Sequence, residues 1–181
     1  MKYEAEAIIM SEIGKFLMNG SLYRGVKPVM WSPVEKTALA EAEIEYHDHV
    51  STTIFARFPI KKAPLEILND YEIIIWTTTP WTMPGNRAVA YGKDIDYSLL
   101  EITSVNENSL AKIGDKIVVA NQLLEEAIKE LSISNYNVSK NLKGSDLEGS
   151  ILAHPLNGYG YDHDVLLLEA DFVTTDQGTG F

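Results

Sequence analysis

The chain has no cysteine, no apolar run long enough to cross a membrane, and few basic side chains. Without cysteine it forms no disulfide, no thiolate metal site and no cysteine nucleophile, which suits a cytoplasmic protein. A membrane helix needs about 18–20 consecutive apolar residues, so we expect no membrane partner. The 15 Lys and Arg residues stand against 26 Asp and Glu, giving a net charge of −11. This balance excludes a protein that coats a nucleic-acid duplex through clustered basic side chains.

What is present is the composition of a folded domain. Of the 181 residues, 45% are hydrophobic and 23% are charged, which excludes a disordered chain. The acidic first residues lack the apolar segment of a signal peptide. The length allows one core, or one domain with a short appendage.

Two helices and many short strands are predicted. Apolar side chains at helical spacing predict a helix over residues 1–19 and another over 121–131, with Asn121 as its N-cap. Pro59 is expected to end a strand at 51–58, since proline cannot donate to a β-ladder. Further strands are expected at 71–76, 87–91, 97–102, 116–120, 137–142, 150–154 and 165–170.

These elements predict an α+β fold, with a mixed, barrel-like β-sheet and a few peripheral helices. A short strand is expected near residues 22–31, and a weak helical start followed by extended chain at 37–46. A break near residues 46–50 separates this helical front from the β body.

One segment is unusual, namely Trp-Thr-Thr-Thr-Pro-Trp-Thr-Met-Pro-Gly-Asn-Arg at residues 76–87. A buried strand at 73–76 continues into three β-branched threonines. Side chains alternate along a strand, so Thr77 and Thr79 should share one face while Thr78 takes the other.

The strand should end where this segment turns into a short helix. Thr79 before Pro80 has the form of an N-cap followed by a first helical proline, and the Pro-Gly at 84–85 limits the helix. Free N–H groups and hydroxyls at such a junction can hold an ester carbonyl, a ribose hydroxyl or a water. The same pattern also fits a plain strand end with a helix cap, with the tryptophans in the core.

Residues 76–87 closely resemble the threonine-rich motif of the editing domain of isoleucyl-tRNA synthetase, an insertion in the class I catalytic fold. The valyl and leucyl enzymes typically carry Thr-Thr-Arg-Pro at this place and lack the tryptophans found here as Trp76 and Trp81. Gly178-Thr179-Gly180 resembles the start of the second editing motif.

Residues 20–33 and 37–46 resemble the catalytic-body sequence that precedes the insertion. The resemblance therefore assigns residues 1–48 to a connection from the synthetase catalytic body and 49–181 to an editing domain that is C-terminally incomplete. The apolar residues 26–31 would pack on the catalytic body and be exposed without it.

The resemblance implies hydrolysis of valine wrongly attached to isoleucine tRNA, a need that arises because one methylene discriminates poorly between the two amino acids. The implied partners are the 3′ end of the aminoacylated tRNA, the valine moiety and the rest of the synthetase. A direct attack by water is expected, with no covalent intermediate. The residues implied as catalytic are Thr78, Thr79 and Asn86, and those implied as substrate-binding are Thr77, Trp81, Thr82, Gly178, Thr179 and Gly180.

No metal or organic cofactor is implied for this chain. ATP and Mg²⁺ are expected only for the whole synthetase, whose His-Ile-Gly-His and Lys-Met-Ser-Lys-Ser signatures do not occur here. In the family, the Gly-Thr-Gly motif continues into Val-His-x-Ala-Pro and an acidic pair that are central to editing. Since Phe181 is the last residue given, we expect weak or no activity from the chain by itself.

Two other functions remain open. One is an editing domain of the valyl or leucyl type. The other is a non-catalytic β-barrel binding module in which the threonines only end a strand.

The histidines suggest no second site. His47 and His49 supply two imidazoles without a clear third metal ligand, which favours a solvated loop. His154 and His163 are expected to be loop histidines, and Asp176 a turn residue.

Overall fold

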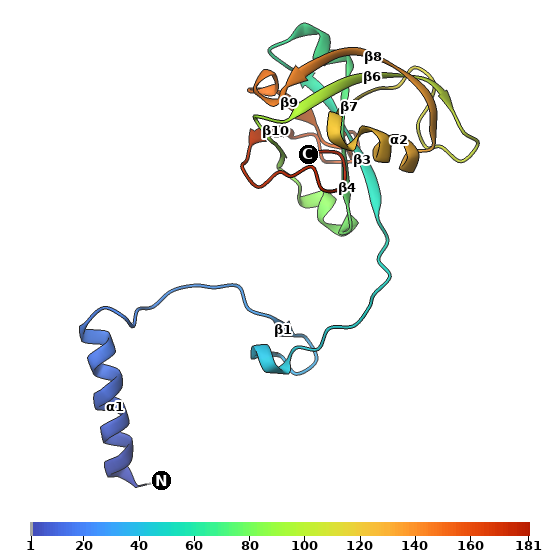
Figure 1. The fold of residues 1–181 in the computed structure, drawn as a ribbon. Coiled ribbons are helices and arrows are strands. Elements are labelled where there is room, and N and C mark those ends of the chain that lie inside the picture. Colours follow the sequence, from blue (N-terminus) through green and yellow to red (C-terminus); the bar gives the residue numbers. More distant parts are fainter. Residues whose placement is uncertain (1) are drawn as a thin grey trace. The chain divides into compact units, whose positions relative to one another are not determined.

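The computed structural model describes residues 2–181, and the chain divides into two units, Met1–His49 and Val50–Phe181 (Figure 1). The first unit contains α1 (Tyr3–Met18), the antiparallel pair β1 (Trp31–Ser32) and β2 (Thr37–Ala38), and the 3₁₀ turn η1 (Glu41–Glu43). The predicted first helix is confirmed for the described residues. None of the described residues of this unit is buried, so its apolar side chains have no core.

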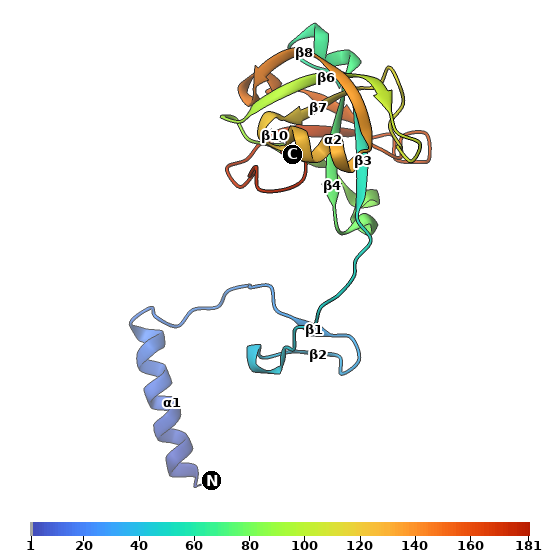
Figure 2. The same ribbon diagram turned by 45° about the vertical axis from the view of Figure 1, so that its right-hand side comes forward.

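The second unit is built on one mixed sheet of eight strands (Figures 1 and 2). Its strands are β3 (Ile54–Lys62), β4 (Glu72–Thr77), β5 (Ala88–Tyr91), β6 (Asp96–Val105), β7 (Lys116–Ala120), β8 (Ile133–Lys143), β9 (Ile151–Ala153) and β10 (Asp164–Glu169). Their spatial order is β5-β10-β9-β3-β4-β7-β6-β8, and only the pairs β5–β10 and β4–β7 are parallel.

The helical parts of this unit are short. They are η2 (Glu66–Asp70), η3 (Pro80–Gly85), η4 (Asn121–Leu123), α2 (Leu124–Glu130) and η5 (Gly144–Leu147). None of the helices in the described chain is long and apolar enough to cross a membrane.

The sheet curls around the larger of two buried hydrophobic clusters. Tyr91 of β5 and Leu142 of β8, which stand at opposite ends of the strand order, belong to the same buried cluster as Phe58 and Leu152 of the central strands. A second cluster lies on the other face, where Ala127 of α2 covers the strands. Because successive side chains of a strand point to opposite faces of the sheet, the same strands contribute residues to both clusters. The predicted α+β fold with a mixed, barrel-like sheet and few helices is confirmed.

Pro59 does not end β3, so that prediction was wrong. The N–H of Ile60 donates to the Tyr71 carbonyl on the β4 side, at 3.0 Å. Because donors alternate between the two sides of a strand, the nitrogen of Pro59 faces away from β4. Pairing with β9 on that side begins only at Ile60, so the proline removes no ladder hydrogen bond.

Asn121 does not act as the N-cap of the second helix, because Ala120 holds that position before η4. The side-chain oxygen of Asn121 instead accepts a hydrogen bond from the Ser98 hydroxyl, at 2.6 Å. The helix predicted at 121–131 is present as the 3₁₀ turn η4, which continues into α2.

Candidate functional site

Two threonine hydroxyls meet at the end of β4. The hydroxyl oxygens of Thr77 and Thr79 lie 3.1 Å apart, and Thr77 Oγ1 also accepts the Thr79 N–H, at 3.1 Å. Thr78 between them is exposed. Because β4 ends at Thr77, the two side chains are brought together by a turn built on the Thr77 hydroxyl, which bends the chain out of the sheet, and not by the predicted alternation of a strand.

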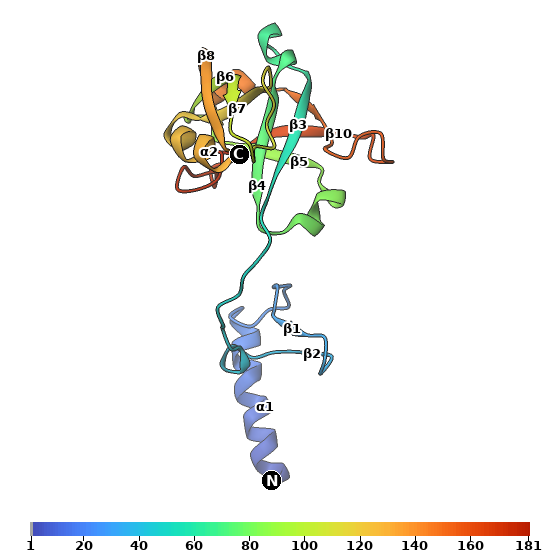
Figure 3. The same ribbon diagram turned by 90° about the vertical axis from the view of Figure 1, so that its right-hand side faces the viewer.

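The short helix predicted after this turn is the 3₁₀ helix η3, with Pro80 at its start (Figure 3). The side chain of Thr79 does not cap it, which corrects the expected N-cap hydrogen bond. Instead, Thr82 Oγ1 donates to the Thr79 carbonyl at 2.7 Å, and the two hydroxyl oxygens lie 3.5 Å apart. The hydroxyl of Thr79 is thus placed between those of Thr77 and Thr82.

These three hydroxyls form one hydrogen-bonded chain. The Thr82 hydroxyl donates its hydrogen bond to a carbonyl, so its oxygen accepts from the Thr79 hydroxyl. The Thr79 oxygen in turn accepts from the Thr77 hydroxyl. The threonine oxygens keep free lone pairs for a ligand. Threonine does not ionise near neutral pH, so the cluster can orient a water or an ester but supplies no general base.

Asn86 follows η3 and is held at three of its polar groups. Its N–H donates to the Met83 carbonyl at 3.0 Å, its Nδ2 donates to the Ala88 carbonyl at 3.1 Å, and its own carbonyl accepts from His163 Nε2 at 3.0 Å. Its Oδ1 is buried and has no hydrogen-bond partner. A buried acceptor without a partner costs free energy unless a ligand or water satisfies it.

His154 and His163 lie in the loop between β9 and β10, as expected, but each is hydrogen-bonded to a backbone carbonyl at the end of η3. His154 is only 1% exposed, and its Nε2 donates to the Met83 carbonyl at 2.8 Å. No local sequence pattern marks these contacts, because the partner residues Met83 and Asn86 are far away along the chain.

The Gly-Thr-Gly segment lies beside the threonine segment. A Cβ on Gly178 would be 3.7 Å from the Trp76 side chain, one residue before Thr77. The Thr179 carbonyl accepts from the Ala120 N–H at 2.9 Å, and its buried hydroxyl has no partner. A cavity of about 350 Å³ borders this contact. It is lined by Trp76, Ala90, Phe172, Val173, Thr174, Gln177, Gly178 and Phe181.

The remaining candidate residues stand apart from this arrangement. The side chain of Trp81 is 73% exposed, so it forms no wall of a closed pocket within the unit. Asp176 lies in an exposed bend, as expected. His47 and His49 are exposed in the other unit. The described residues contain no group of three or more His, Asp or Glu side chains arranged to hold a metal ion.

Comparisons with known proteins agree with the resemblance of the chain to a class I tRNA synthetase. The family model described as tRNA synthetases class I (I, L, M and V) matches residues 1–169. The chain is 57% identical over 182 residues to the isoleucine–tRNA ligase of Gluconobacter oxydans, and 52% identical over 180 residues to that of Pelagibacter ubique. Each alignment covers 99% of this chain and 19% of the relative, so the chain spans about a fifth of their length.

Among solved structures, the crystal structure of GlLeuRS-CP1 is similar, with a TM-score of 0.45 and 20% sequence identity. The similarity covers 61% of this chain and 36% of that one.

Proposed function

Because the chain belongs to the family of class I tRNA synthetases, we propose that its Val50–Phe181 unit is the editing domain of an isoleucine enzyme. In this role it hydrolyses the ester that joins valine to isoleucine tRNA. The relatives named isoleucine–tRNA ligase support this choice of amino acid. Valine is smaller than isoleucine by one methylene, so an activation pocket rejects it incompletely and a second site must remove it.

The observation that carries the proposal is the hydroxyl chain of Thr77, Thr79 and Thr82. It occupies one end of η3, and Asn86 with its unpartnered Oδ1 follows the other end. Donors and acceptors without an ionisable group are suited to holding a neutral ester and a water. They would be a poor set for amino-acid activation, which handles charged phosphates.

The proposed reaction uses water and no cofactor. Water attacks the carbonyl carbon of the ester, the bond from that carbon to the ribose oxygen breaks, and the ribose oxygen takes up a proton. The products are free valine and uncharged tRNA. Thr79 and Thr82 orient the water and the ester carbonyl, while Asn86 Oδ1 accepts a hydrogen bond from the substrate. Rate enhancement from this chain then comes from orientation.

The other assigned residues have supporting roles in the proposal. Thr77 and Thr78 line the site of the terminal adenosine, Trp81 borders it, and residues 178–180 support it from the side of Trp76. The Met1–His49 unit is the connection to the synthetase catalytic body, which supplies the basic surface for the rest of the tRNA. A net charge of −11 is compatible with this, because only the single-stranded tRNA end enters the site.

The test measures deacylation of valyl and isoleucyl isoleucine-tRNA by the synthetase that carries this chain. We expect Thr79→Ala to lower the rate with the valyl substrate about 10–100-fold, the effect of losing one or two hydrogen bonds in the transition state. Thr79→Ser keeps the hydroxyl and should stay within about 3-fold of the parent. Asn86→Ala should resemble Thr79→Ala.

Equal rates for the parent and Thr79→Ala would overturn the proposal. The same conclusion follows if isoleucyl-tRNA is hydrolysed as fast as valyl-tRNA. A second measurement uses the 181-residue chain and a non-hydrolysable amide analogue of valyl-adenosine. Shifts of the Thr79, Thr82 and Asn86 amide signals on titration would support binding at this site. A binding module without catalytic function would show the shifts but no hydrolysis in the synthetase.

A further inference from the structure

Two carbonyl groups at the end of η3 each accept a hydrogen bond from an imidazole. His154 Nε2 donates to the Met83 carbonyl at 2.8 Å, and His163 Nε2 donates to the Asn86 carbonyl at 3.0 Å. We propose that these two histidines are positioning residues of the proposed editing site, which fix Asn86 so that its free Oδ1 meets the substrate. The inference rests on the proposed function.

Topology brings the two rings together. His154 directly follows the last residue of β9, and His163 directly precedes the first residue of β10. Those two strand residues, Ala153 and Asp164, are partners in the antiparallel register. The histidines therefore extend a cross-strand pair beyond the sheet, and their ring centroids lie 5.0 Å apart.

His154 is fixed in one tautomer. The N–H of Leu156 donates to its Nδ1 at 3.1 Å, so Nδ1 bears no proton and Nε2 bears the one given to Met83. Both ring nitrogens are occupied by backbone groups. The ring has no nitrogen left to move a proton in the reaction, which is why we assign it a positioning role.

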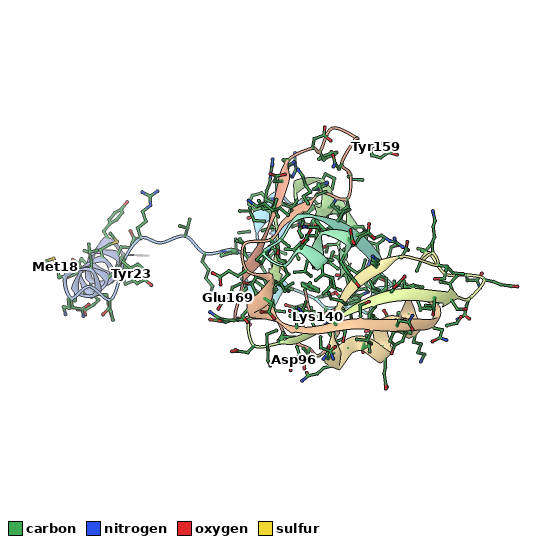
Figure 4. The ribbon with its side chains drawn as sticks, turned by 90° about the horizontal axis from the view of Figure 1, so that it is seen from above. Met18, Tyr23, Asp96, Lys140, Tyr159 and Glu169 are labelled. Carbon is green, nitrogen blue, oxygen red and sulfur yellow. The ribbon has the colours of Figure 1, made fainter. Side chains whose placement is uncertain are left out.

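Aromatic packing keeps the ring of His154 in place. The ring stacks on Tyr161, with centroids 5.2 Å apart and an angle of 20° between the planes. It also makes an edge-to-face contact with Phe58, with ring centroids 6.4 Å apart. Tyr159, in the same loop, projects away from the sheet and is 82% exposed (Figure 4). The loop thus turns one tyrosine outward and uses the next to cover the histidine.

The consequence for the site lies at Asn86. With its N–H, Nδ2 and carbonyl all hydrogen-bonded, the residue has one polar atom left, the buried Oδ1. Loss of the His163 donor frees the carbonyl and lets the peptide rotate, which moves Oδ1. A displacement of this kind lowers the rate of an oriented reaction more than it weakens binding.

The test uses isosteric pairs. The amide nitrogen of glutamine can take the place of Nε2, whereas the amide oxygen of asparagine can take the place of Nδ1. In the synthetase that carries this chain, we expect His163→Ala to lower kcat for valyl-tRNA hydrolysis about 10-fold with KM changed less than about 2-fold. His163→Gln should restore most of kcat. His154→Gln should likewise exceed His154→Asn in kcat.

The control is His49→Ala, an exposed histidine of the other unit, which should leave kcat unchanged. Folding is checked in the 181-residue chain by the amide spectrum of the Val50–Phe181 unit, and two-bond proton–nitrogen correlations should show the Nε2–H tautomer for His154. Unchanged kcat in His163→Ala, or equal loss in His163→Ala and His163→Gln, would overturn the inference. If the parent itself does not hydrolyse valyl-tRNA, the proposed function fails. In that case the tautomer and the amide signal of Asn86 in each variant still decide whether the histidines fix this residue.

Discussion

The hydroxyl of Tyr97 donates to the carbonyl of Gly180 at 2.7 Å. The same oxygen accepts the Gly92 N–H at 3.1 Å, and the Phe181 ring lies against the Tyr97 ring with centroids 4.7 Å apart. One fully buried phenol of β6 therefore joins the end of β5 to the Gly-Thr-Gly segment. This bond holds the segment next to Trp76 and the proposed site.

The buried phenol predicts a loss of stability in alkali. Burial raises the pKa of Tyr97 to about 12, although the Gly92 N–H opposes the shift and Tyr91 adds to it. Because the folded-state pKa lies above the ordinary value of 10.0, stability is complete below pH 10 and falls as the pH rises toward 12. Between pH 9 and pH 11 the loss should be about 1 kcal/mol.

Urea unfolding of the parent and of Tyr97→Phe at the two pH values measures this effect. The phenylalanine variant should be less stable at pH 9 by about 1–3 kcal/mol, because the Gly92 N–H and the Gly180 carbonyl lose their partner. Its disadvantage should shrink by about 1 kcal/mol at pH 11. A constant difference between the two proteins would contradict the assigned cause.

The two glycines of the second motif predict unequal effects of alanine. Both have a positive φ, 81° at Gly178 and 87° at Gly180, but a Cβ on Gly180 would be 2.3 Å from Ala120 Cβ. At Gly178 the nearest contact is an ordinary 3.7 Å from Trp76. Gly178→Ala should therefore cost about 1 kcal/mol from backbone strain, and Gly180→Ala at least about 2 kcal/mol more from the clash.

Thermal unfolding of the two variants checks the order, and each serves as the control for the other. In Gly180→Ala we also expect the Ala120 amide, which donates to the Thr179 carbonyl, to exchange faster with solvent. Equal destabilisation by the two substitutions would show that Ala120 yields without cost.

Local patterns in the sequence were sufficient for most of the strands. The strand at 116–120 has the predicted bounds, and β4 and β5 begin within one residue of those expected. These strands have buried faces on one or both sides, so their apolar residues carry a clear signal. The strand predicted at 137–142 was shorter than β8. Most side chains of β8 are exposed, and polar residues such as Asn135 give no strand pattern.

The site was only partly predictable. Thr77 and Thr79 do lie together, but β4 ends at Thr77, so a turn makes this contact and not the alternation of a strand. Thr79 holds the predicted N-cap position before Pro80, but its hydroxyl lies between those of two other threonines and does not cap the helix. The contacts of His154 with Met83 and of His163 with Asn86 join distant parts of the sequence, so only the folded sheet brings them together.

A partly buried ion-pair cluster predicts a loss of stability in acid. Arg57 of β3 pairs with Glu72 at 3.1 Å and with Asp115. Burial opposes ionisation of Asp115, but its hydrogen bonds from Arg57 and the Lys112 N–H and the nearby positive charges lower its pKa below 3.8. Since the folded-state pKa is depressed, this stability is present above about pH 4 and is lost as the pH falls below it.

Asp115→Asn should therefore destabilise the protein by about 1 kcal/mol at pH 7, since water partly screens the pair, and by much less at pH 3. The matched control is Asp164→Asn, which removes the partner of Lys61 in an exposed pair and should cost less than about 0.5 kcal/mol. Urea unfolding at both pH values gives the four numbers. A cost for Asp115→Asn that does not depend on pH would argue against the ion pair as its source.

The exposed apolar face of α1 predicts self-association of the chain. Ile9, Ile13, Phe16 and Leu17 recur at helical spacing, and each is 44–60% exposed. The two buried clusters of the Val50–Phe181 unit contain residues of that unit alone. Removal of residues 1–49 should therefore leave its free energy of unfolding within about 0.5 kcal/mol of the parent.

Light scattering over a concentration series distinguishes the two units. The 181-residue chain should form dimers or larger species as concentration rises, whereas residues 50–181 should stay monomeric, because a contiguous apolar surface in water favours association. The double substitution Ile13→Glu with Phe16→Lys places charges on the same helical face and should abolish association without shortening the chain. If residues 50–181 associate as strongly as the whole chain, the contact lies on the sheet, where β5 and β8 are the two ends of the strand order and expose unpaired backbone groups.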